Sequence, residues 1–177
     1  MQKKTAFVII DMQIGLLEEC VQERETLDHI NIVLSKARDN NIPVIYVQHD
    51  GPQGDSLEPD TPTWYIHPDI VPRANEPVVR KASPDAFFET TLQQELETRG
   101  IQHLVVAGGQ TEYCIDTSVR RAVSCGYDVT LVADAHTTSD RERWPAAQII
   151  ALHNETLDGF WAGERRVRVK PAAEITF

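Results

Sequence analysis

Cysteine is scarce in this sequence, and its arrangement argues against two kinds of structural cross-link. Only Cys20, Cys114 and Cys125 occur among the 177 residues, and no two of them have C-x-x-C spacing. An odd number of cysteines without that spacing is typical neither of a disulfide framework nor of a zinc site. The plainest interpretation of each cysteine is a small buried hydrophobic residue.

Positive charge and long apolar runs are also lacking. The net charge is −10, which argues against nucleic acid or an anionic membrane as the main partner. It does not exclude a small-molecule substrate, because a local pocket can be basic within an acidic protein. No stretch approaches the ~20 apolar residues of a membrane span. Asp11 interrupts the first apolar run too early for a signal peptide, so we predict a cytoplasmic protein.

Internal repeats, low-complexity tracts and linkers are absent as well, and the length suits a single domain over residues 1–177. Apolar and β-branched runs alternate with segments of helical periodicity, which predicts an α/β fold with a parallel sheet of βαβ units. The expected strands are 5–10, 42–47, 77–81, 103–109, 128–135 and an edge strand at 167–170. The expected helices are 24–39, 90–100, 111–126 and about 141–159.

Residues 48–75 form a long segment without either periodicity. This segment holds five prolines, two glycines, two aromatic residues and two histidines. Long loops in compact domains usually act as lids or binding segments. We therefore expect it to border a ligand site.

Three chemically reactive residues follow expected strands. Asp11 comes directly after 5–10, Lys81 ends 77–81, and Cys114 follows 103–109 by a short turn. Ligands of open parallel sheets bind at the carboxyl ends of the strands, so these residues are expected on one rim. Taken singly, Asp11 is more often a turn cap, Lys81 a solvated surface residue and Cys114 an inert core thiol.

The three residue types also suit one another chemically. We expect the helix N-terminus and a nearby lysine to lower the pKa of the Cys114 thiol, because both stabilise a thiolate. A carboxylate such as Asp11 can take the thiol proton and later pass it to a leaving amine. Gly108 and Gly109 permit a turn whose N–H groups face a tetrahedral intermediate.

At these residues the sequence resembles the isochorismatase-like cysteine hydrolases. The matching blocks are AFVIIDMQ at 6–13, VVRKASPDAFFET at 78–90, and VVAGGQTEYCIDTSVRRAVSCGYDVTLVADA at 105–135. The resemblance implies a three-layer, Rossmann-like sandwich with a six-stranded, mostly parallel sheet flanked by helices. It also implies a triad in which Asp11 is the general base and acid, Lys81 the electrostatic partner and Cys114 the nucleophile.

The resemblance further implies a cis peptide bond between Gly109 and Gln110, and an oxyanion hole made by the N–H groups of Gln110 and Cys114. Relatives that hydrolyse the vinyl ether of isochorismate lack the cysteine, which is present here. Nicotinamidases carry an Asp-x-His pair and a further His as metal ligands. Here QHDG stands at 48–51 and His67 stands alone, so we expect no metal and no other cofactor.

The function expected from this resemblance is hydrolysis of an amide, carbamoyl or ureide-type C–N bond through a covalent acyl-enzyme. The alternatives are an ether or ester hydrolase, and a non-catalytic binding protein on the same fold. The resemblance also implies a homodimer or homotetramer. Trp64 and Tyr65 are expected either to wall the substrate pocket or to anchor their loop. The full set of pocket candidates is Gln13, His49, Trp64, Tyr65, His67, Phe87 and Glu112.

Overall fold

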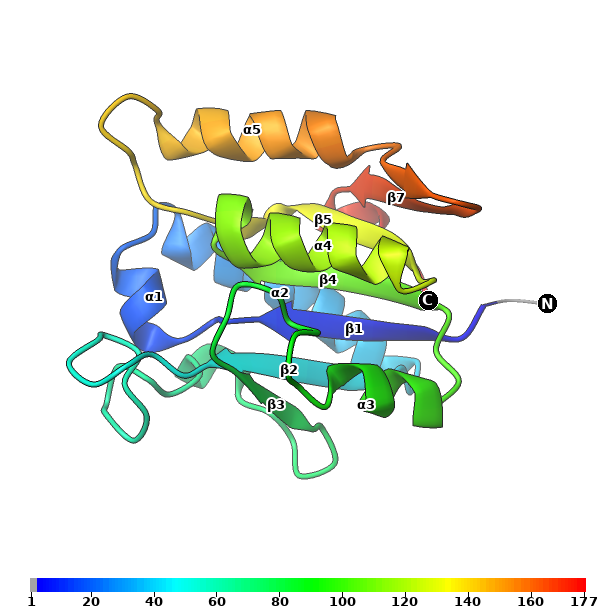
Figure 1. Cartoon of the computed structure of the whole chain (residues 1–177), viewed down its shortest axis with the longest axis horizontal. Helices are drawn as coiled ribbons and strands as arrows, with labels where there is room; N and C mark the ends of the chain where they lie inside the picture. The colour runs from blue at the N-terminus through cyan, green and yellow to red at the C-terminus, as the bar shows by residue number, and fades with distance from the viewer. Residues whose placement is uncertain (1–2) are drawn as a thin grey trace.

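The computed structural model describes residues 3–177, and its seven strands form one sheet in the order β3-β2-β1-β4-β5-β7-β6 (Figure 1). The strands are β1 (Thr5–Ile10), β2 (Val44–His49), β3 (Val78–Lys81), β4 (His103–Gly109), β5 (Asp128–Thr137), β6 (Trp161–Ala162) and β7 (Arg165–Lys170). The helices are α1 (Ile14–Glu18), α2 (Glu23–Asp39), α3 (Leu92–Thr98), α4 (Asp116–Ser124) and α5 (Ala146–Leu157). Single helical turns are η1 (Pro68–Ile70), η2 (Thr111–Ile115) and η3 (Ala172–Glu174).

Six of the strands are parallel, as predicted, and the seventh corrects the predicted number. Strand β6 has two residues and pairs antiparallel with β7. Gly163, with φ +60°, lies in the two-residue turn between these strands, where glycine adopts positive φ at little cost. Strand β6 pairs only with Arg165 and Arg166, while Val167, the first residue of the predicted edge strand, exchanges backbone hydrogen bonds with Gly159 and Phe160.

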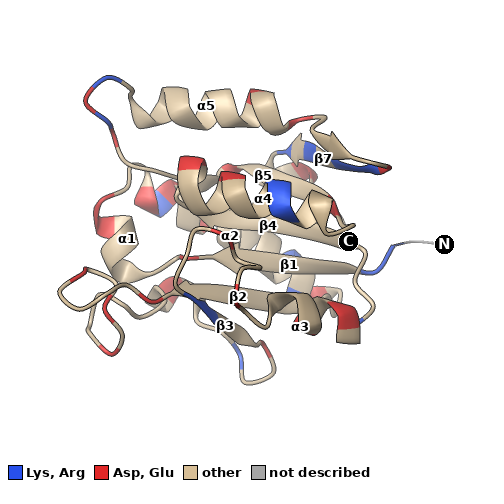
Figure 2. Ribbon diagram, in the orientation of Figure 1, with Lys and Arg blue, Asp and Glu red and all other residues tan. Residues whose placement is uncertain are grey.

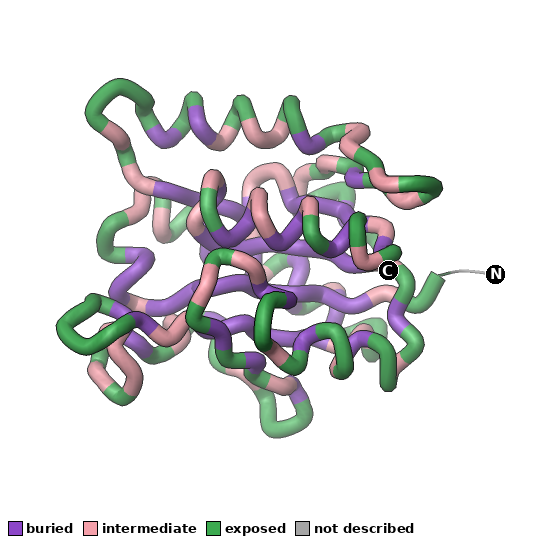
Figure 3. The backbone as a smooth tube through the Cα atoms, in the orientation of Figure 1, coloured by how far each residue is buried: buried purple, intermediate pink, exposed green. Residues whose placement is uncertain are grey.

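Helices cover both faces of the sheet. In Figure 1, α3 and α4 lie in front of the strands and α2 lies behind them. Strand β1 shows why its sequence is apolar throughout: Ala6, Val8 and Ile10 enter one core cluster, while Phe7 and Ile9 enter the other. Side chains alternate between the faces of a strand, so a strand covered on both sides needs a continuous apolar run. Figure 3 shows the resulting band of buried residues through the sheet.

Two expected helices begin later than predicted. The segment 111–126 divides into one π-helical turn, η2, followed by α4. The helix expected at about 141 begins at Ala146, because Pro145 precedes it in extended conformation and residues before a proline avoid the helical region. Both changes affect the rim of the sheet where the reactive residues lie.

No helix among residues 3–177 is long and apolar enough to cross a membrane. Acidic residues are spread over the helices and loops, whereas β7 carries a cluster of basic residues (Figure 2). The overall negative charge therefore says little about any single site.

Candidate active site

The structure brings Asp11, Lys81 and Cys114 together at the carboxyl edge of the sheet. Strand β1 lies between β2 and β4, so the strand order reverses beside it. Such a reversal opens a crevice at the ends of the strands. Asp11 directly follows β1, Lys81 is the last residue of β3, and Cys114 lies in the turn after β4. Chain topology alone thus explains why residues so distant in sequence meet.

Lys81 is the centre of this group. Its Nζ lies 2.6 Å from Oδ2 of Asp11 and 3.3 Å from Sγ of Cys114. It also lies 3.0 Å from Nδ1 of His49 and donates to the carbonyl of Ser83 at 2.9 Å. The side chains of Lys81 and Asp11 are buried, and a buried ammonium is tolerated only when it is paired and hydrogen-bonded. The three N–H bonds of the Lys81 ammonium have four neighbouring acceptors, so the charge is both paired and hydrogen-bonded.

The approach of β1 to β4 depends on Gly108. This residue has φ +134° and pairs with Ile10 in the parallel ladder. A Cβ at this position would lie 2.0 Å from the carbonyl oxygen of Ile10. Asp11 itself adopts a left-handed φ of 53°, a conformation in which Asp is enriched among non-glycine residues. The backbone at the end of β1 therefore turns sharply beside Cys114.

The nucleophile turn, residues 110–115, follows a cis peptide bond between Gly109 and Gln110, where the resemblance placed one. The carbonyl of Gln110 accepts from the N–H groups of Tyr113 and Ile115. Within residues 3–177, the N–H of Gln110 has no protein acceptor. A free N–H beside a thiol is the type of donor that an oxyanion hole requires.

A buried hydrogen-bonded chain holds this turn from behind. Nε2 of His136 and Oδ1 of Asn154 are 2.9 Å apart, and Asn154 donates through Nδ2 to the carbonyl of Ala133. The amide oxygen of Asn154 must therefore accept from His136, which places the imidazole proton on Nε2. Nδ1 of His136 then accepts from the Thr111 hydroxyl at 2.9 Å. Thr111 is the first residue of η2, so the chain ties the turn to β5 and α5.

The protonation state of Cys114 differs from the sequence-based expectation. Burial raises the pKa of the thiol, the negative charge of Asp11 raises it further, and Lys81 lowers it only partly, leaving it at about 12. Burial also lowers the pKa of Lys81, but Asp11 and Cys114 outweigh burial and raise it. The expected lowering of the thiol pKa was therefore wrong, because that argument left out desolvation and the Asp11 charge. The resting site holds a neutral thiol beside a charged Asp–Lys pair.

His49 is neutral and has a defined tautomer. Burial lowers its pKa, and the charge of Lys81 lowers it further. Because the Lys81 ammonium can only donate, Nδ1 of His49 is the acceptor and Nε2 carries the proton. The sequence placed His49 among the pocket candidates, and the structure brings it to the triad.

A small cavity of about 220 Å³ opens onto these residues. Its polar lining comes from Asp11, His49, Gln110 and Cys114, and its apolar walls from the residues Leu16, Leu57, Pro84 and Tyr113. Leu57 belongs to the loop at 48–75, so this loop closes over the cavity of its own chain. The volume suits a small substrate or the reacting end of a larger one.

Gln13 and Trp64 anchor the loop and do not line this cavity. The Gln13 amide donates to the carbonyls of His49 and Trp64 and accepts from the N–H of His49. Trp64 is buried, donates to the carbonyl of His49, and lies under the Arg80 guanidinium at 4.2 Å. Of the two interpretations of Trp64, anchoring is the one that its contacts support.

The other four pocket candidates also lie outside this cavity. Tyr65 is exposed, and Phe87 packs in the core beside Tyr127. His67 accepts from the N–H of Asp69 at the start of η1. Glu112 lines a neighbouring hollow and pairs with Arg141 at 2.6 Å. These four residues were predicted because they lie near the triad residues or in the loop at 48–75. Their side chains instead point to solvent, to the core or to a neighbouring hollow.

The residues that sequence reasoning missed are the apolar walls Leu16, Leu57, Pro84 and Tyr113. Each lies a few residues from a polar residue of the site or within the loop at 48–75. The sequence shows that these residues lie near the ends of strands or in the loop. It does not show whether such a residue lines the cavity or packs in the core.

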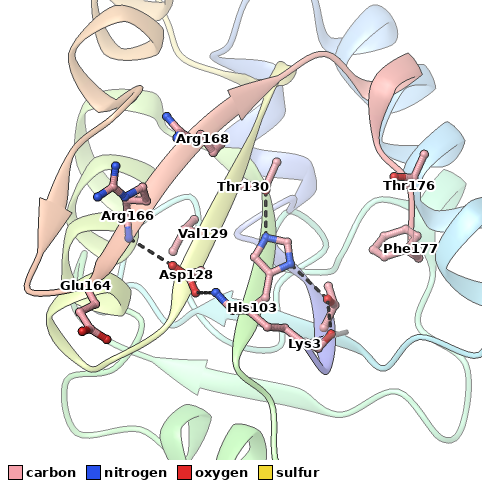
Figure 4. A pocket seen from close by; sticks show the side chains of 11 residues that line it. Lys3, His103, Asp128, Val129, Thr130, Glu164, Arg166, Arg168, Thr176 and Phe177 are labelled. Carbon is pink, nitrogen blue, oxygen red and sulfur yellow. Dashed lines mark hydrogen bonds and ion pairs between the residues drawn. The ribbon is translucent and has the colours of Figure 1, made fainter. Parts of the chain in front are cut away.

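A second hollow of about 500 Å³ lies at the opposite edge of the sheet (Figure 4). His103 lies there between the hydroxyls of Thr5 and Thr130, and Asp128 pairs with Lys3. These polar groups already satisfy one another, and no cysteine lines the hollow within the described chain. The candidate active site is therefore the smaller cavity at the carboxyl edge.

No group of three or more His, Cys, Asp or Glu side chains within residues 3–177 is arranged to hold a metal ion. At the site, the ammonium of Lys81 contacts both His49 and Asp11. The sequence-based expectation of a site without metal stays a prediction.

Comparison with known proteins identifies the family to which this architecture belongs. The isochorismatase domain model matches residues 5–154, which is most of the chain. The chain belongs to the isochorismatase family. The family match confirms the predicted resemblance, and the largely parallel sheet covered by helices confirms the predicted α/β class.

Three relatives show how far this family likeness extends. Streptothricin hydrolase of Streptomyces noursei is 35% identical over 97% of this chain, which spans 64% of that relative's length. Nicotinamidase 3 of Arabidopsis thaliana is 26% identical, and the match covers 88% of this chain and 79% of the length of that relative. The solved structure of an isochorismatase from Pseudomonas putida KT2440 is 30% identical with a TM-score of 0.87, covering 97% of this chain and 90% of that one.

Proposed function

We propose that this isochorismatase-family hydrolase cleaves an amide, carbamoyl or ureide-type C–N bond of a small molecule, with Cys114 as the nucleophile. The observation that carries the proposal is the placement of one buried ammonium, Lys81, against both the thiol and the Asp11 carboxylate. A thiol, a base and a free backbone N–H at one cavity are the parts needed for acyl transfer.

The first half of the reaction forms an acyl-enzyme. Asp11 removes the thiol proton as the sulfur attacks the substrate carbonyl carbon, so a C–S bond forms and the carbonyl oxygen becomes an oxyanion. The N–H groups of Gln110 and Cys114 stabilise that oxyanion. Asp11 then returns the proton to the leaving nitrogen as the C–N bond breaks. The raised pKa of the thiol makes this base necessary, because little thiolate exists before the substrate binds.

The second half regenerates the thiol. Asp11 takes a proton from water, the resulting hydroxide attacks the thioester carbonyl, and the C–S bond breaks to release an acid. The proton held by Asp11 returns to the sulfur. Throughout, Lys81 stays charged because Asp11 and Cys114 raise its pKa, and it stabilises whichever of the two carries negative charge.

The relatives support a C–N bond as the target. Among them are streptothricin hydrolase and a nicotinamidase, the second of which is named for the hydrolysis of an amide. The presence of Cys114 favours amide hydrolysis over the ether reaction, for which the resemblance implies no cysteine. Nicotinamide itself is disfavoured as the substrate, because the chain lacks the Asp-x-His spacing at 48–51.

Replacing Cys114 with alanine tests the mechanism. We expect the Cys114→Ala variant to lose at least about a thousandfold in kcat on an amide substrate, because it lacks the attacking atom. Cys125→Ala is the matched control, since Cys125 is a half-buried cysteine at the end of α4, outside the cavity. Hydrolysis that survives in Cys114→Ala would contradict the thiol mechanism and favour an ether or ester hydrolase in which Asp11 does the proton work.

A further inference from the structure

The cavity at the triad offers a substrate no free positive charge. Among the described residues, those that line it include neither lysine nor arginine, and Asp11 is its one carboxylate. His49 is neutral because burial and Lys81 lower its pKa. The walls formed by Leu16, Leu57 and Pro84 are apolar. The lining therefore presents neutral hydrogen-bond donors and one carboxylate, which the buried Lys81 already pairs.

The cations nearest the cavity are already paired. Lys81 is buried against Asp11 and divides its donors among four neighbours. Arg80 pairs with Asp50 at 2.6 Å and lies over Trp64. A substrate carboxylate could recruit this guanidinium only by breaking contacts that already exist.

The third cation, on the other side of the cavity, is Arg141. Its guanidinium pairs with Glu112 at 2.6 Å and donates to the side chain of Gln110. It also lies 5.2 Å from the centre of the Tyr113 ring. The positive charge of Arg141 is thus already paired with the carboxylate of Glu112.

We infer that the acyl part of the substrate, the part that enters this cavity beside the scissile carbonyl, is uncharged and largely apolar. This rests on the proposed function for the site and deepens it. A carboxylate in the cavity would lose its hydration without gaining a counter-ion and would lie close to Asp11. The substrate class is therefore an amide whose acyl part carries no charge, and amides with a carboxylate in the acyl part are excluded.

The experiment compares iodoacetamide with iodoacetate, two alkylating agents of similar size that differ by one negative charge. In both reactions the thiolate attacks the methylene carbon, a C–S bond forms and iodide leaves. Rates at Cys114 and at Cys125 are measured by peptide mass spectrometry at mildly alkaline pH. Cys125 of the same molecule corrects for overall charge, and 2-mercaptoethanol corrects for intrinsic reactivity.

We expect the iodoacetamide-to-iodoacetate rate ratio to be at least roughly tenfold higher at Cys114 than at Cys125, because the anion is excluded from the cavity. Leu57→Lys should remove most of this excess by adding a cation to the wall. Tyr65→Lys is the matched control, since it adds the same charge to an exposed residue of the same loop outside the cavity. Equal ratios at the two cysteines, or preferential labelling of Cys114 by iodoacetate, would overturn the inference.

A second measurement separates this inference from the proposed function. Butyramide and succinamate are amides that differ in whether the acyl chain ends in a methyl or a carboxylate group. Faster hydrolysis of butyramide supports the inference, whereas faster hydrolysis of succinamate overturns it and leaves the thiol hydrolase intact. Amide hydrolysis that is unchanged in Cys114→Ala counts against the proposed function, while the labelling ratios still decide the charge of the cavity.

Discussion

Lys81 shows how one buried charge organises a site. Moving an ammonium out of water costs several kcal/mol unless partners replace its hydration. Here Asp11, Cys114, His49 and the carbonyl of Ser83 surround it. Burial also raises the pKa of the Cys114 thiol, and the negative charge of Asp11 raises it further, so the thiol stays protonated. In the proposed mechanism, Cys114 therefore becomes reactive by proton transfer to Asp11 and not as a thiolate already present in the resting protein.

Asp11→Asn separates the two effects of that carboxylate. Removing its negative charge lowers the pKa of Cys114, so we expect alkylation by iodoacetamide at pH ~8 to become faster by about tenfold or more. Turnover should nevertheless be lost, because no base remains to accept and return the proton. Labelling rates and substrate turnover are measured on the same preparation.

A thermal melt of Asp11→Asn checks that the variant is folded, since the substitution leaves Lys81 without its carboxylate. Lys81→Met is the converse variant and should slow alkylation, because Lys81 is the group that lowers the thiol pKa. Unchanged or slower labelling in a folded Asp11→Asn protein would mean that the carboxylate does not control the thiol.

Among the elements, the contact between β1 and β4 is the one on which the site depends most directly. The two strands pair from Thr5 with His103 to Ile10 with Gly108, and Asp11 and the nucleophile turn follow at their ends. Gly109 is also constrained, since a Cβ there would lie 2.8 Å from Leu16, a wall of the cavity. The glycine pair thus permits both the strand contact and the cavity.

Gly108→Ala should be strongly destabilising. Its Cβ would lie 2.0 Å from the Ile10 carbonyl oxygen, so backbone atoms must move, and we expect a loss of about 3 kcal/mol or more in the free energy of unfolding. Gly126→Ala is the matched control, because Gly126 also has positive φ but its Cβ would meet nothing within 4 Å. The control should lose only about 1 kcal/mol, the cost of the left-handed conformation. Urea unfolding of both variants tests the difference, and equal losses would contradict the steric argument.

The molecule as a whole is expected to be sensitive to acid, because it folds around neutral histidines. Burial lowers the pKa of His136 to about 4 and also lowers the pKa values of His49 and His103. As pH falls below the ordinary histidine pKa, the unfolded chain takes up protons that the folded chain refuses. The buried histidines therefore contribute fully to the free energy of unfolding above about pH 6.5. This contribution is lost as pH falls toward the pKa of the histidine in the folded protein. The acidic net charge does not predict this, since it says nothing of individual buried groups.

His136→Gln should reduce this dependence on pH. Between pH 7 and pH 5 the wild-type protein is expected to lose roughly 2 kcal/mol through His136 alone, and the variant lacks that contribution. The measurement is the free energy of unfolding in urea at the two pH values for both proteins. The comparison uses the change with pH, so a lower overall stability of His136→Gln does not obscure it. An identical pH dependence would show that His136 is not the group responsible.

Much of the architecture was predictable because it follows from local pattern. Apolar runs such as 5–10 and 103–109 marked strands covered on both faces, and parallel strands bring their carboxyl ends to one rim. Asp11, Lys81 and Cys114 stand at those ends, so their meeting followed from their positions along the chain. The resemblance to the isochorismatase-like hydrolases depended on the same residues. Self-association as a homodimer or homotetramer and a cytoplasmic location stay predictions.

The remaining features depend on burial and side-chain direction, which a linear pattern does not contain. Trp64 became a loop anchor because its indole packs inward under Arg80, while Leu57 of the same loop became a cavity wall. The pKa of Cys114 was raised where the sequence favoured lowering, because desolvation acts only once the fold surrounds the thiol. The meeting of the three proposed catalytic residues followed from their positions at the ends of strands along the chain. The protonation states of these residues and the shape of the cavity depend on how distant segments pack together. Only the tertiary structure therefore decided them.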